Sequence, residues 1–365
     1  MNSIRMLVII FVVFILSSCS NNKSKTQSRN IVIEDSPLPK EVADASIFND
    51  LLTLKRVVNL ETLPQSLIGE IESIYYIPSE NKIIILDSKV AKSIFVFNLE
   101  GKFMYKIGRH GIGPGEFLAP NNIAVDNNRV IVFDSARLTL LFYNLSGKFI
   151  NEISFPSNNW NFYVDRMYLW KNDLYIYDNN EYRNVAPDGK DYRVFVIKDC
   201  KHFDSAYGKH ENTLDFDGGD ITSFNNRIVY SDIFAGNIYQ ILSGENQPVI
   251  LASMGVLTNI NDYNNLGALL KNIRNVDVVT SMATIRGFLF VKHNFNITII
   301  NNSGKILKDL QYKFILPKGY SGLASRLGFI FYNNGIIVAS NDERKISESE
   351  VPNPSLIFYE IKDNK

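Results

Sequence analysis

Short runs of apolar residues that end in a polar residue recur along this chain at a nearly constant spacing. Residues 83–87 (IIILD) and 130–134 (VIVFD) are the clearest examples, and each is followed by a second apolar run and a Gly-Lys turn. The two runs lie 47 residues apart, and the turn glycines Gly101 and Gly147 lie 46 apart. Alternating short strands and turns with a fixed period indicate one repeated supersecondary unit.

Weaker copies of this unit continue toward the end of the chain. The polar residues that end the runs are Asp87, Asp134, Asp178, Asp232, Lys292 and Ser340. Their mean spacing of about 51 residues is close to one four-stranded blade with its loops. A sandwich does not require six near-equal units, and a parallel β-helix repeats over a much shorter period. The pattern therefore predicts an all-β chain, folded over residues 46–365 as a six-bladed β-propeller of four-stranded antiparallel blades.

Closure of such a ring needs a strand that joins the first and last blades. Residues 54–60 are strand-like and precede the first repeat, whereas residues 356–361 form the last apolar run. We expect 54–60 to add the outer strand to the last blade. Hydrogen bonds between these two segments would then close the ring.

The amino-terminal segment has the pattern of an export signal. Arg5 precedes an apolar run of 11 residues, 6–16, and the sequence Leu-Ser-Ser-Cys that ends at Cys19 resembles a lipobox. As a helix the run would span roughly 16 Å, about half of a bilayer's hydrocarbon core. The sequence predicts a signal peptide at 1–18, lipidation of Cys19 and a flexible tether over 19–45. An ordinary signal peptide with a coincidental cysteine is the alternative.

The residues that follow Cys19 bear on where the anchored protein would face. They are polar, and they lack an acidic cluster. Such a cluster would resemble a surface-export signal in lipoproteins of the Bacteroidetes type. We therefore expect a lipid-anchored protein of the cell envelope on a periplasm-facing leaflet.

The charge of the chain limits which partners it can bind, and its cysteine content limits which covalent bonds can stabilise the fold. The chain has 38 basic and 38 acidic residues, which gives no electrostatic basis for binding nucleic acid. Cys19 and Cys200 are its two cysteines, so lipidation of Cys19 leaves no pair for an intramolecular disulfide. A composition of 45% apolar and 12% aromatic residues is enough for a large core, which must hold the fold together.

A glycine-rich segment between the first two units carries a family resemblance. Residues 108–117 (GRHGIGPGEF) are followed by 120–126 (PNNIAVD). Together with the Gly-Lys turns and the lipobox-like start, this segment resembles the six-bladed β-propeller lipoproteins common in Bacteroidetes, whose repeats are similar to NHL repeats. The resemblance covers about 54–365, with irregular third and fifth blades. It implies the fold but not the function, because propellers support binding, scaffolding and several kinds of chemistry.

The same glycine-rich segment is the first candidate site. It lacks the Lys-Ser/Thr ending of a phosphate-binding loop, and no helix pattern follows. One interpretation is a sharp turn between blades with Phe117 packed between them. The other is a contact surface formed by Arg109, His110 and Glu116.

A second candidate site follows from the topology of a propeller. The loops that lead into the innermost strands converge on one face, so residues about 50 apart in sequence can meet around the axis. The residues expected on these loops are Glu72, Asn122, Asp165, Arg166, Asp220 and Arg326.

Metal binding and catalysis have weaker signals. Asp215, Asp217 and Asp220 offer the oxygen ligands that Ca²⁺ accepts, but a 12-residue EF-hand loop would need a later glutamate. A solvated turn is the alternative. Cys200, His202 and His210 lack a fourth zinc ligand with suitable spacing, and Gly-x-Ser-x-Gly is absent. We expect no cofactor, with calcium as the one candidate metal.

The sequence thus favours a lipid-anchored propeller that binds an envelope protein, peptide or glycan without chemistry. The alternatives are a metal-dependent hydrolase, lactonase or lyase with its site at the propeller axis, and a structural scaffold.

Overall fold

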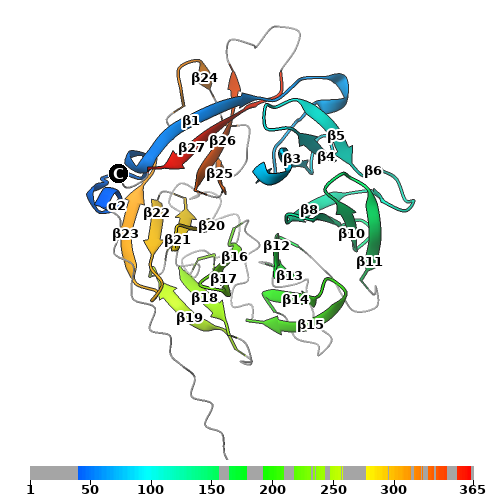
Figure 1. Ribbon diagram of the computed structural model, residues 1–365. Helices are drawn as coiled ribbons and strands as arrows, with labels where there is room; N and C mark the ends of the chain where they lie inside the picture. Colours follow the sequence, from blue (N-terminus) through cyan, green and yellow to red (C-terminus); the bar gives the residue numbers. More distant parts are fainter. Residues whose placement is uncertain are drawn as a thin grey trace, which may run out of the picture. The chain divides into compact units, whose positions relative to one another are not determined.

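Six antiparallel sheets are arranged around a common axis in the computed structural model (Figure 1). The structure describes residues 40–155, 164–178, 192–208, 218–231, 233–234, 236–242, 247–255, 257, 277–294, 296–313, 316–321, 323, 328–332, 334–342 and 352–362. All of these residues belong to the unit Asp35–Lys365. The predicted six-bladed propeller of four-stranded antiparallel blades is confirmed.

The blades follow one another along the chain, and within each blade the strands run from the axis outward. Blade 1 consists of β2 (Ser73–Ile77), β3 (Lys82–Asp87), β4 (Ser93–Phe97) and β5 (Phe103–Ile107). Blade 2 consists of β8 (Pro120–Val125), β9 (Arg129–Asp134), β10 (Thr139–Asn144) and β11 (Phe149–Ser154). Blade 3 consists of β12 (Arg166–Trp170), β13 (Asp173–Tyr177), β14 (Val194–Lys198) and β15 (His202–Tyr207).

The last three blades repeat this order. Blade 4 consists of β16 (Ile221–Phe224), β17 (Arg227–Ser231), β18 (Asn237–Ile241) and β19 (Val249–Ser253). Blade 5 consists of β20 (Val279–Ile285), β21 (Phe288–His293), β22 (Asn296–Ile300) and β23 (Ile306–Gln311). Blade 6 consists of β25 (Phe329–Tyr332), β26 (Gly335–Asp342), β27 (Ser355–Ile361) and β1 (Leu52–Asn59). The short strand β24 (Tyr320–Ser321) pairs with the end of β26.

The outer strand of blade 6 comes from the beginning of the described chain. Strand β1 pairs with β27 from Leu52 opposite Ile361 to Asn59 opposite Ser355. The predicted closure between the first and last strands is therefore confirmed. It joins the two ends of the ring through a backbone ladder.

Short helical elements precede and follow β1. They are α2 (Lys40–Asp44), η1 (Phe48–Leu51), η2 (Pro64–Ser66) and, after β2, η3 (Pro78–Glu80). Val42, Ala45 and Phe48 are buried in a cluster with side chains of blades 5 and 6. Because α2 falls within 19–45, the structure places the last part of that segment against the propeller.

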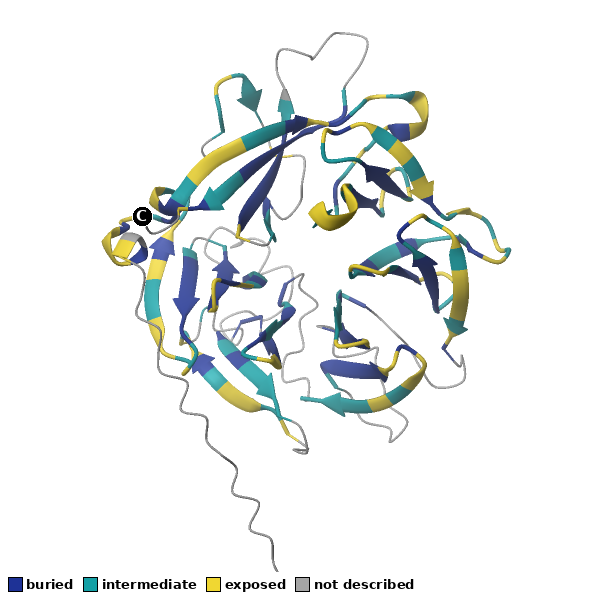
Figure 2. Ribbon diagram, in the orientation of Figure 1, coloured by how far each residue is buried: buried dark blue, intermediate teal, exposed yellow. Residues whose placement is uncertain are grey.

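The second strand of each blade explains the periodic signal in the sequence. Strands β3, β9 and β13 are buried at almost every position, because neighbouring blades cover both of their faces. Apolar side chains of adjacent blades form shared clusters, such as that of Ile84 and Val96 with Val132. Figure 2 shows buried positions on the middle strands and exposed positions on the outermost ones. A strand covered on both faces must be continuously apolar, which makes it visible as a run.

In blades 1 and 2, the polar residue that ends a run stabilises the loop entering the same blade. Asp87 is fully buried, and its Oδ2 accepts hydrogen bonds from the backbone N–H groups of Gly69 and Glu70 at 2.7 and 3.1 Å. Asp134 is also buried and accepts from Leu118 and Ala119. Charge-assisted bonds of this kind stabilise a buried carboxylate and fix the loop that leads to the axis.

Candidate functional site

A cavity of about 470 Å³ lies along the axis, between the innermost strands of all six blades. These strands are β2, β8, β12, β16, β20 and β25 (Figure 1). We call this cavity the axial pocket. Its volume is within the range of roughly 300–1,000 Å³ that is typical of small-molecule sites.

Four residues predicted at the axis line this pocket together. Glu72 comes from blade 1, Asn122 from blade 2, Arg166 from blade 3 and Asp220 from the loop that enters blade 4. The backbone carbonyl of Asp165 accepts a hydrogen bond from Asn122 Nδ2 at 2.7 Å, next to the pocket. Arg326 lies outside the described residues. Residues up to 148 positions apart in sequence therefore line one pocket on the propeller axis.

Hydrogen bonds between successive inner strands organise the wall of the pocket. Tyr75 of blade 1 donates to the carbonyl of Ile123 at 2.8 Å. Asn122 of blade 2 donates to the carbonyl of Asp165, at the entrance to blade 3. A hydrogen bond of 2.9 Å joins the hydroxyls of Tyr168 in blade 3 and Ser223 in blade 4. Because each bond crosses a blade boundary, the wall from blade 1 to blade 4 forms one connected polar arc. Burial raises the pKa of Tyr75, so its hydroxyl stays protonated and able to donate.

The arc continues to blade 5 through Asp220. Its Oδ1 accepts from the backbone N–H of Ile221 at 2.8 Å, and its Oδ2 accepts from that of Met282 at 2.6 Å. Burial raises the pKa of Asp220, whereas the positive charge of Arg166 and these backbone hydrogen bonds lower it, and the net shift is upward. The carboxylate thus connects the entrance of blade 4 to the inner strand of blade 5.

Sequence reasoning did not identify Lys292, the polar end of the fifth run, as part of this region. The residue is 3% exposed, and its Nζ lies 4.5 Å from the ring centroid of Phe329 at the start of β25. Its pKa is lowered to about 8, mainly by burial and also by the positive charge of Arg166, while the charge of Asp220 acts in the opposite direction. The charges of Arg166 and Asp220 thus both influence Lys292, although Lys292 is not among the residues that line the pocket.

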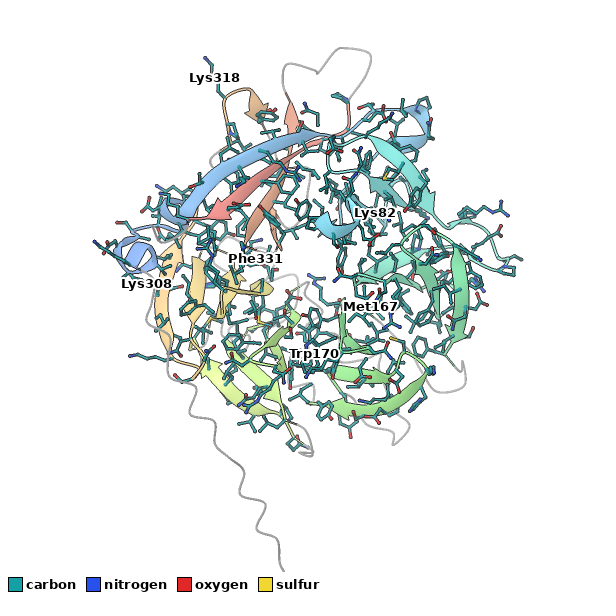
Figure 3. The ribbon with its side chains drawn as sticks, in the orientation of Figure 1. Lys82, Met167, Trp170, Lys308, Lys318 and Phe331 are labelled. Atoms are coloured by element: carbon teal, nitrogen blue, oxygen red, sulfur yellow. The ribbon has the colours of Figure 1, made fainter. Side chains whose placement is uncertain are left out.

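The wall contributed by blade 6 is apolar and aromatic. Ile330, Phe331 and Tyr332 of β25 line the pocket, and the rings of Tyr332 and Tyr76 meet edge to face at 5.3 Å. Figure 3 labels Phe331 and, on the other side of the axis, Met167 of β12. The pocket thus has a polar arc on one side and an aromatic wall on the other.

The glycine-rich segment 108–117 forms a separate structure at the periphery. Its strands β6 (Arg109–His110) and β7 (Glu116–Phe117) pair in parallel, and Phe117 is buried between blades 1 and 2 as predicted (Figure 1). Arg109 Nε lies 2.6 Å from Glu116 Oε1, with 81% of the Arg109 side chain exposed. A backbone hydrogen bond from Gly113 and the bond from Arg109 lower the pKa of Glu116.

The structure does not bring this loop together with the axial residues. Arg109, His110 and Glu116 are absent from the lining of the axial pocket, so the sequence candidates divide into two surfaces. The axial pocket is concave and has polar groups that converge from several blades, which makes it the stronger candidate.

The candidate metal ligands are only partly described. Asp215 and Asp217 lie outside the described residues, and Asp220 is held by backbone groups. No group of three or more His, Cys, Asp or Glu side chains suited to a metal ion occurs in the described part of the chain. Cys200 is buried with its pKa raised to about 11 by burial, and its thiol donates to the carbonyl of Asn172. His210 also lies outside the described residues.

The amino-terminal segment, including Cys19, lies outside the described residues. Within the part that the structure describes, no helix has the length and apolar character needed to cross a bilayer.

Comparison with known proteins places the chain among proteins of similar fold. Residues 43–281 match the family described as a domain of unknown function (DUF4934). No curated protein matches the chain.

Three solved structures resemble most of the chain. A Bacteroides fragilis protein described as exported is 18% identical with a TM-score of 0.60, over 88% of this chain and 98% of that one. A DUF4221 family member from Bacteroides vulgatus is 11% identical with a TM-score of 0.52, over 86% and 98%. Virginiamycin B lyase from Staphylococcus aureus is 12% identical with a TM-score of 0.51, over 85% and 100%. Identities this low show a shared fold, and function must be argued from the site.

Proposed function

The chain belongs to the DUF4934 family, a domain of unknown function, and on that premise we propose that it is a binding protein of the cell envelope. It is exported, anchored by a lipid on Cys19, and holds a ligand or partner at the axial pocket without performing chemistry. The partner is an envelope protein, a peptide or a glycan rather than a nucleic acid, and no cofactor is needed.

Export and anchoring are supported by the beginning of the sequence. A basic residue, an apolar run of 11 residues and a lipobox-like ending precede a polar segment. The Bacteroides fragilis protein of similar fold is described as exported, which agrees with this interpretation. The Gly-Lys turns and the segment 108–117 support the proposed likeness to NHL-like propeller lipoproteins. The lack of an acidic cluster after Cys19 supports a periplasm-facing leaflet.

Replacing Cys19 by serine tests the anchor. We expect the wild-type protein to incorporate an alkyne-tagged fatty acid in growing cells and the Cys19→Ser variant to lose this label completely, because the thiol that carries the lipid is gone. The matched control is Cys200→Ser, which removes a buried thiol and should keep the label. Labelling of the Cys19→Ser variant would contradict the lipoprotein assignment.

One observation carries the binding function: Glu72, Asn122, Arg166 and Asp220 converge from four blades on one pocket. Concave sites with a few convergent polar groups are the usual place for ligand recognition. Hydrogen bonds between inner strands hold the wall in place before any ligand arrives, which reduces the entropy lost on binding.

Capture of partners from intact cells tests this function. We expect crosslinking of the wild-type lipoprotein to recover a discrete partner or ligand, and Arg166→Gln to reduce recovery at least tenfold. Arg109→Gln is the matched control, because Arg109 is exposed on the peripheral loop and should leave recovery unchanged. Loss of capture in Arg109→Gln with retention in Arg166→Gln would move the binding site to the periphery. Equal recovery in all three proteins would contradict both locations.

A further inference from the structure

The unequal walls of the axial pocket carry information about the chemistry of its ligand. The polar arc runs through blades 1 to 5, where side chains of one blade bind the next. The wall from blade 6 presents Ile330, Phe331 and Tyr332. A ligand that satisfies both walls has a charged or polar end and an apolar end.

The polar arc presents charges of both signs. Arg166 is positioned by a bond of 2.8 Å from Nη1 to the carbonyl of Asp165, and it lines the pocket. Glu72 lines the same pocket, and its carboxylate lies 3.6 Å from Lys89 Nζ, with 21% of the side chain exposed. A guanidinium recognises carboxylates through its planar set of donors, and a carboxylate accepts from an ammonium group.

Asp220 adds a further carboxyl group to this lining, whereas Lys292 is not part of it. Asp220 already accepts from two backbone N–H groups, and Lys292 is buried beside Phe329. A zwitterion can place a carboxylate against Arg166 and an ammonium group against Glu72, whereas a ligand of one sign can pair with only one of these two lining groups.

The volume limits the size of the ligand. About 470 Å³ is in the lower half of the roughly 300–1,000 Å³ range of small-molecule sites, so the part of a ligand that enters the pocket is limited to about one or two residues.

On the premise of the proposed function, we propose that the axial pocket binds a zwitterionic α-amino acid or dipeptide with an apolar side chain. The ligand carboxylate lies toward Arg166, its ammonium group toward Glu72, and its side chain against Phe331 and Tyr332.

Binding of a matched series of compounds to the purified full-length lipoprotein tests this proposal. The series comprises L-phenylalanine, the dipeptide Ala-Phe, 3-phenylpropionate, 2-phenylethylamine, and uncharged N-acetylphenylalanine amide. Calorimetry is expected to show at least tenfold tighter binding of a zwitterion than of any analogue that lacks one or both charges. Whichever of L-phenylalanine and Ala-Phe binds more tightly shows whether the ligand has one residue or two.

Two variants assign the charges. In the Arg166→Gln variant, compounds with a carboxylate should no longer bind more tightly than those without one. In the Glu72→Gln variant, compounds with an ammonium group should no longer bind more tightly than those without one. Arg109→Gln serves as the unaffected control. If Arg166→Gln fails to fold, the partly exposed Glu72 still provides the test.

The possible failures of the inference and of the proposed function are distinguishable. Equal affinity for the uncharged amide, or no binding of any compound, overturns the zwitterion proposal. If Arg166→Gln nevertheless loses the partner captured in cells, the binding function stands with a different ligand. If neither compound binding nor capture depends on Arg166, both proposals fall.

Discussion

Replacing Gly101 by alanine is expected to lower the free energy of unfolding by about 3 kcal/mol. Gly101 has φ +86°, in the left-handed region that residues with a Cβ disfavour. A Cβ built on Gly101 would also lie 2.1 Å from the carbonyl oxygen of Asn59 in the closing strand β1. Because this neighbour is backbone, the clash can be relieved only if the turn at Gly101 or the strand that closes the ring moves.

Gly287→Ala is the matched control for this prediction. Gly287 has φ +80°, but an added Cβ would meet no atom within 4 Å. We expect Gly287→Ala to lower the free energy of unfolding by about 1 kcal/mol, through backbone strain alone. Chemical denaturation of the two variants and the wild type measures the difference. An equal decrease in the free energy of unfolding of both variants would show that the close approach of Gly101 to β1 does not add to the destabilisation.

The same turn explains why the sequence repeats Gly-Lys. Gly147 has φ +81° and approaches Tyr105 of β5, whereas Gly304 has φ +85° and approaches the carbonyl of Leu251 in β19. In each case the turn between the third and fourth strands of a blade packs on the outer strand of the preceding blade. The spacing of 46 residues between Gly101 and Gly147 is therefore the spacing of an inter-blade contact.

The fold was predictable because its main signals are local. A second strand covered on both faces must be apolar throughout, and a turn glycine needs a positive φ, so both appear in the sequence at the repeat period. The closing strand was predictable for a related reason, since one strand-like segment preceded the first repeat. These features depend on a residue and its immediate neighbours.

The candidate site was predictable only as far as topology determines it. Glu72, Asn122 and Arg166 were expected at the axis because loops into inner strands converge there, and the structure brings them to one pocket. The roles of Tyr75 and Lys292 were missed, because the sequence cannot show which neighbour an inner-strand side chain will reach. Arg109 and Glu116 pair with each other across β6 and β7, which keeps their loop at the periphery.

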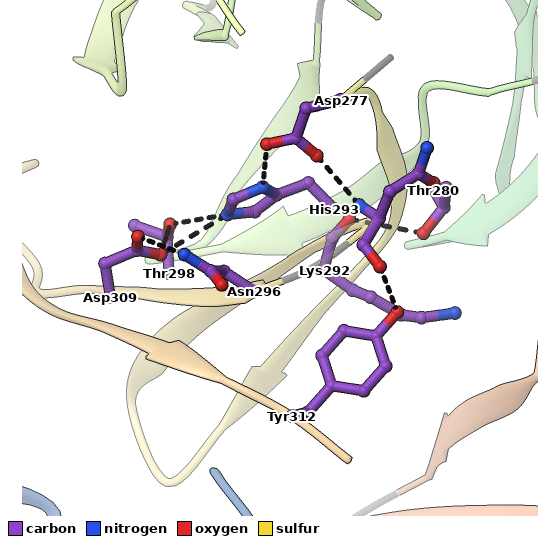
Figure 4. A network of polar contacts seen from close by, with 9 residues as sticks. Asp277, Thr280, Lys292, His293, Asn296, Thr298, Asp309 and Tyr312 are labelled. Carbon is purple, nitrogen blue, oxygen red and sulfur yellow. Dashed lines mark hydrogen bonds and ion pairs between the residues drawn. The ribbon is translucent and has the colours of Figure 1, made fainter. Parts of the chain in front are cut away.

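Replacing His293 by glutamine is expected to remove a stability term that depends on pH. His293 is buried at the end of β21, with Nδ1 2.7 Å from Asp277 Oδ2 and Nε2 3.3 Å from Asp309 Oδ1 (Figure 4). Thr298 Oγ1 lies 3.2 Å from the same Nε2 and donates to Asp309. Burial alone would lower the pKa of His293, but hydrogen bonds to the two carboxylates raise it to about 9.

The sign of the effect follows from this upward shift. A group whose pKa is higher in the folded state stabilises that state fully below the unfolded pKa, here 6.5, and loses its contribution as the pH rises through 9. The difference between the two pKa values corresponds to about 3 kcal/mol. At pH 6.5 the Gln variant should therefore be less stable than the wild type by about this amount, and the gap should close by pH 9.5.

Comparison with the variant is needed because Lys292 titrates in the same range with the opposite sign. Its pKa is lowered to about 8 by burial and by Arg166, so its contribution to stability increases as the pH rises from 8 toward 10.5. Lys292 is present in both proteins, and the difference between their denaturation midpoints across the pH range isolates His293. Asp277→Asn should give a smaller version of the same profile, because Asp309 still pairs with the imidazolium. A constant gap from pH 6.5 to 9.5 would mean that His293 is neutral in the folded protein and that its role is packing.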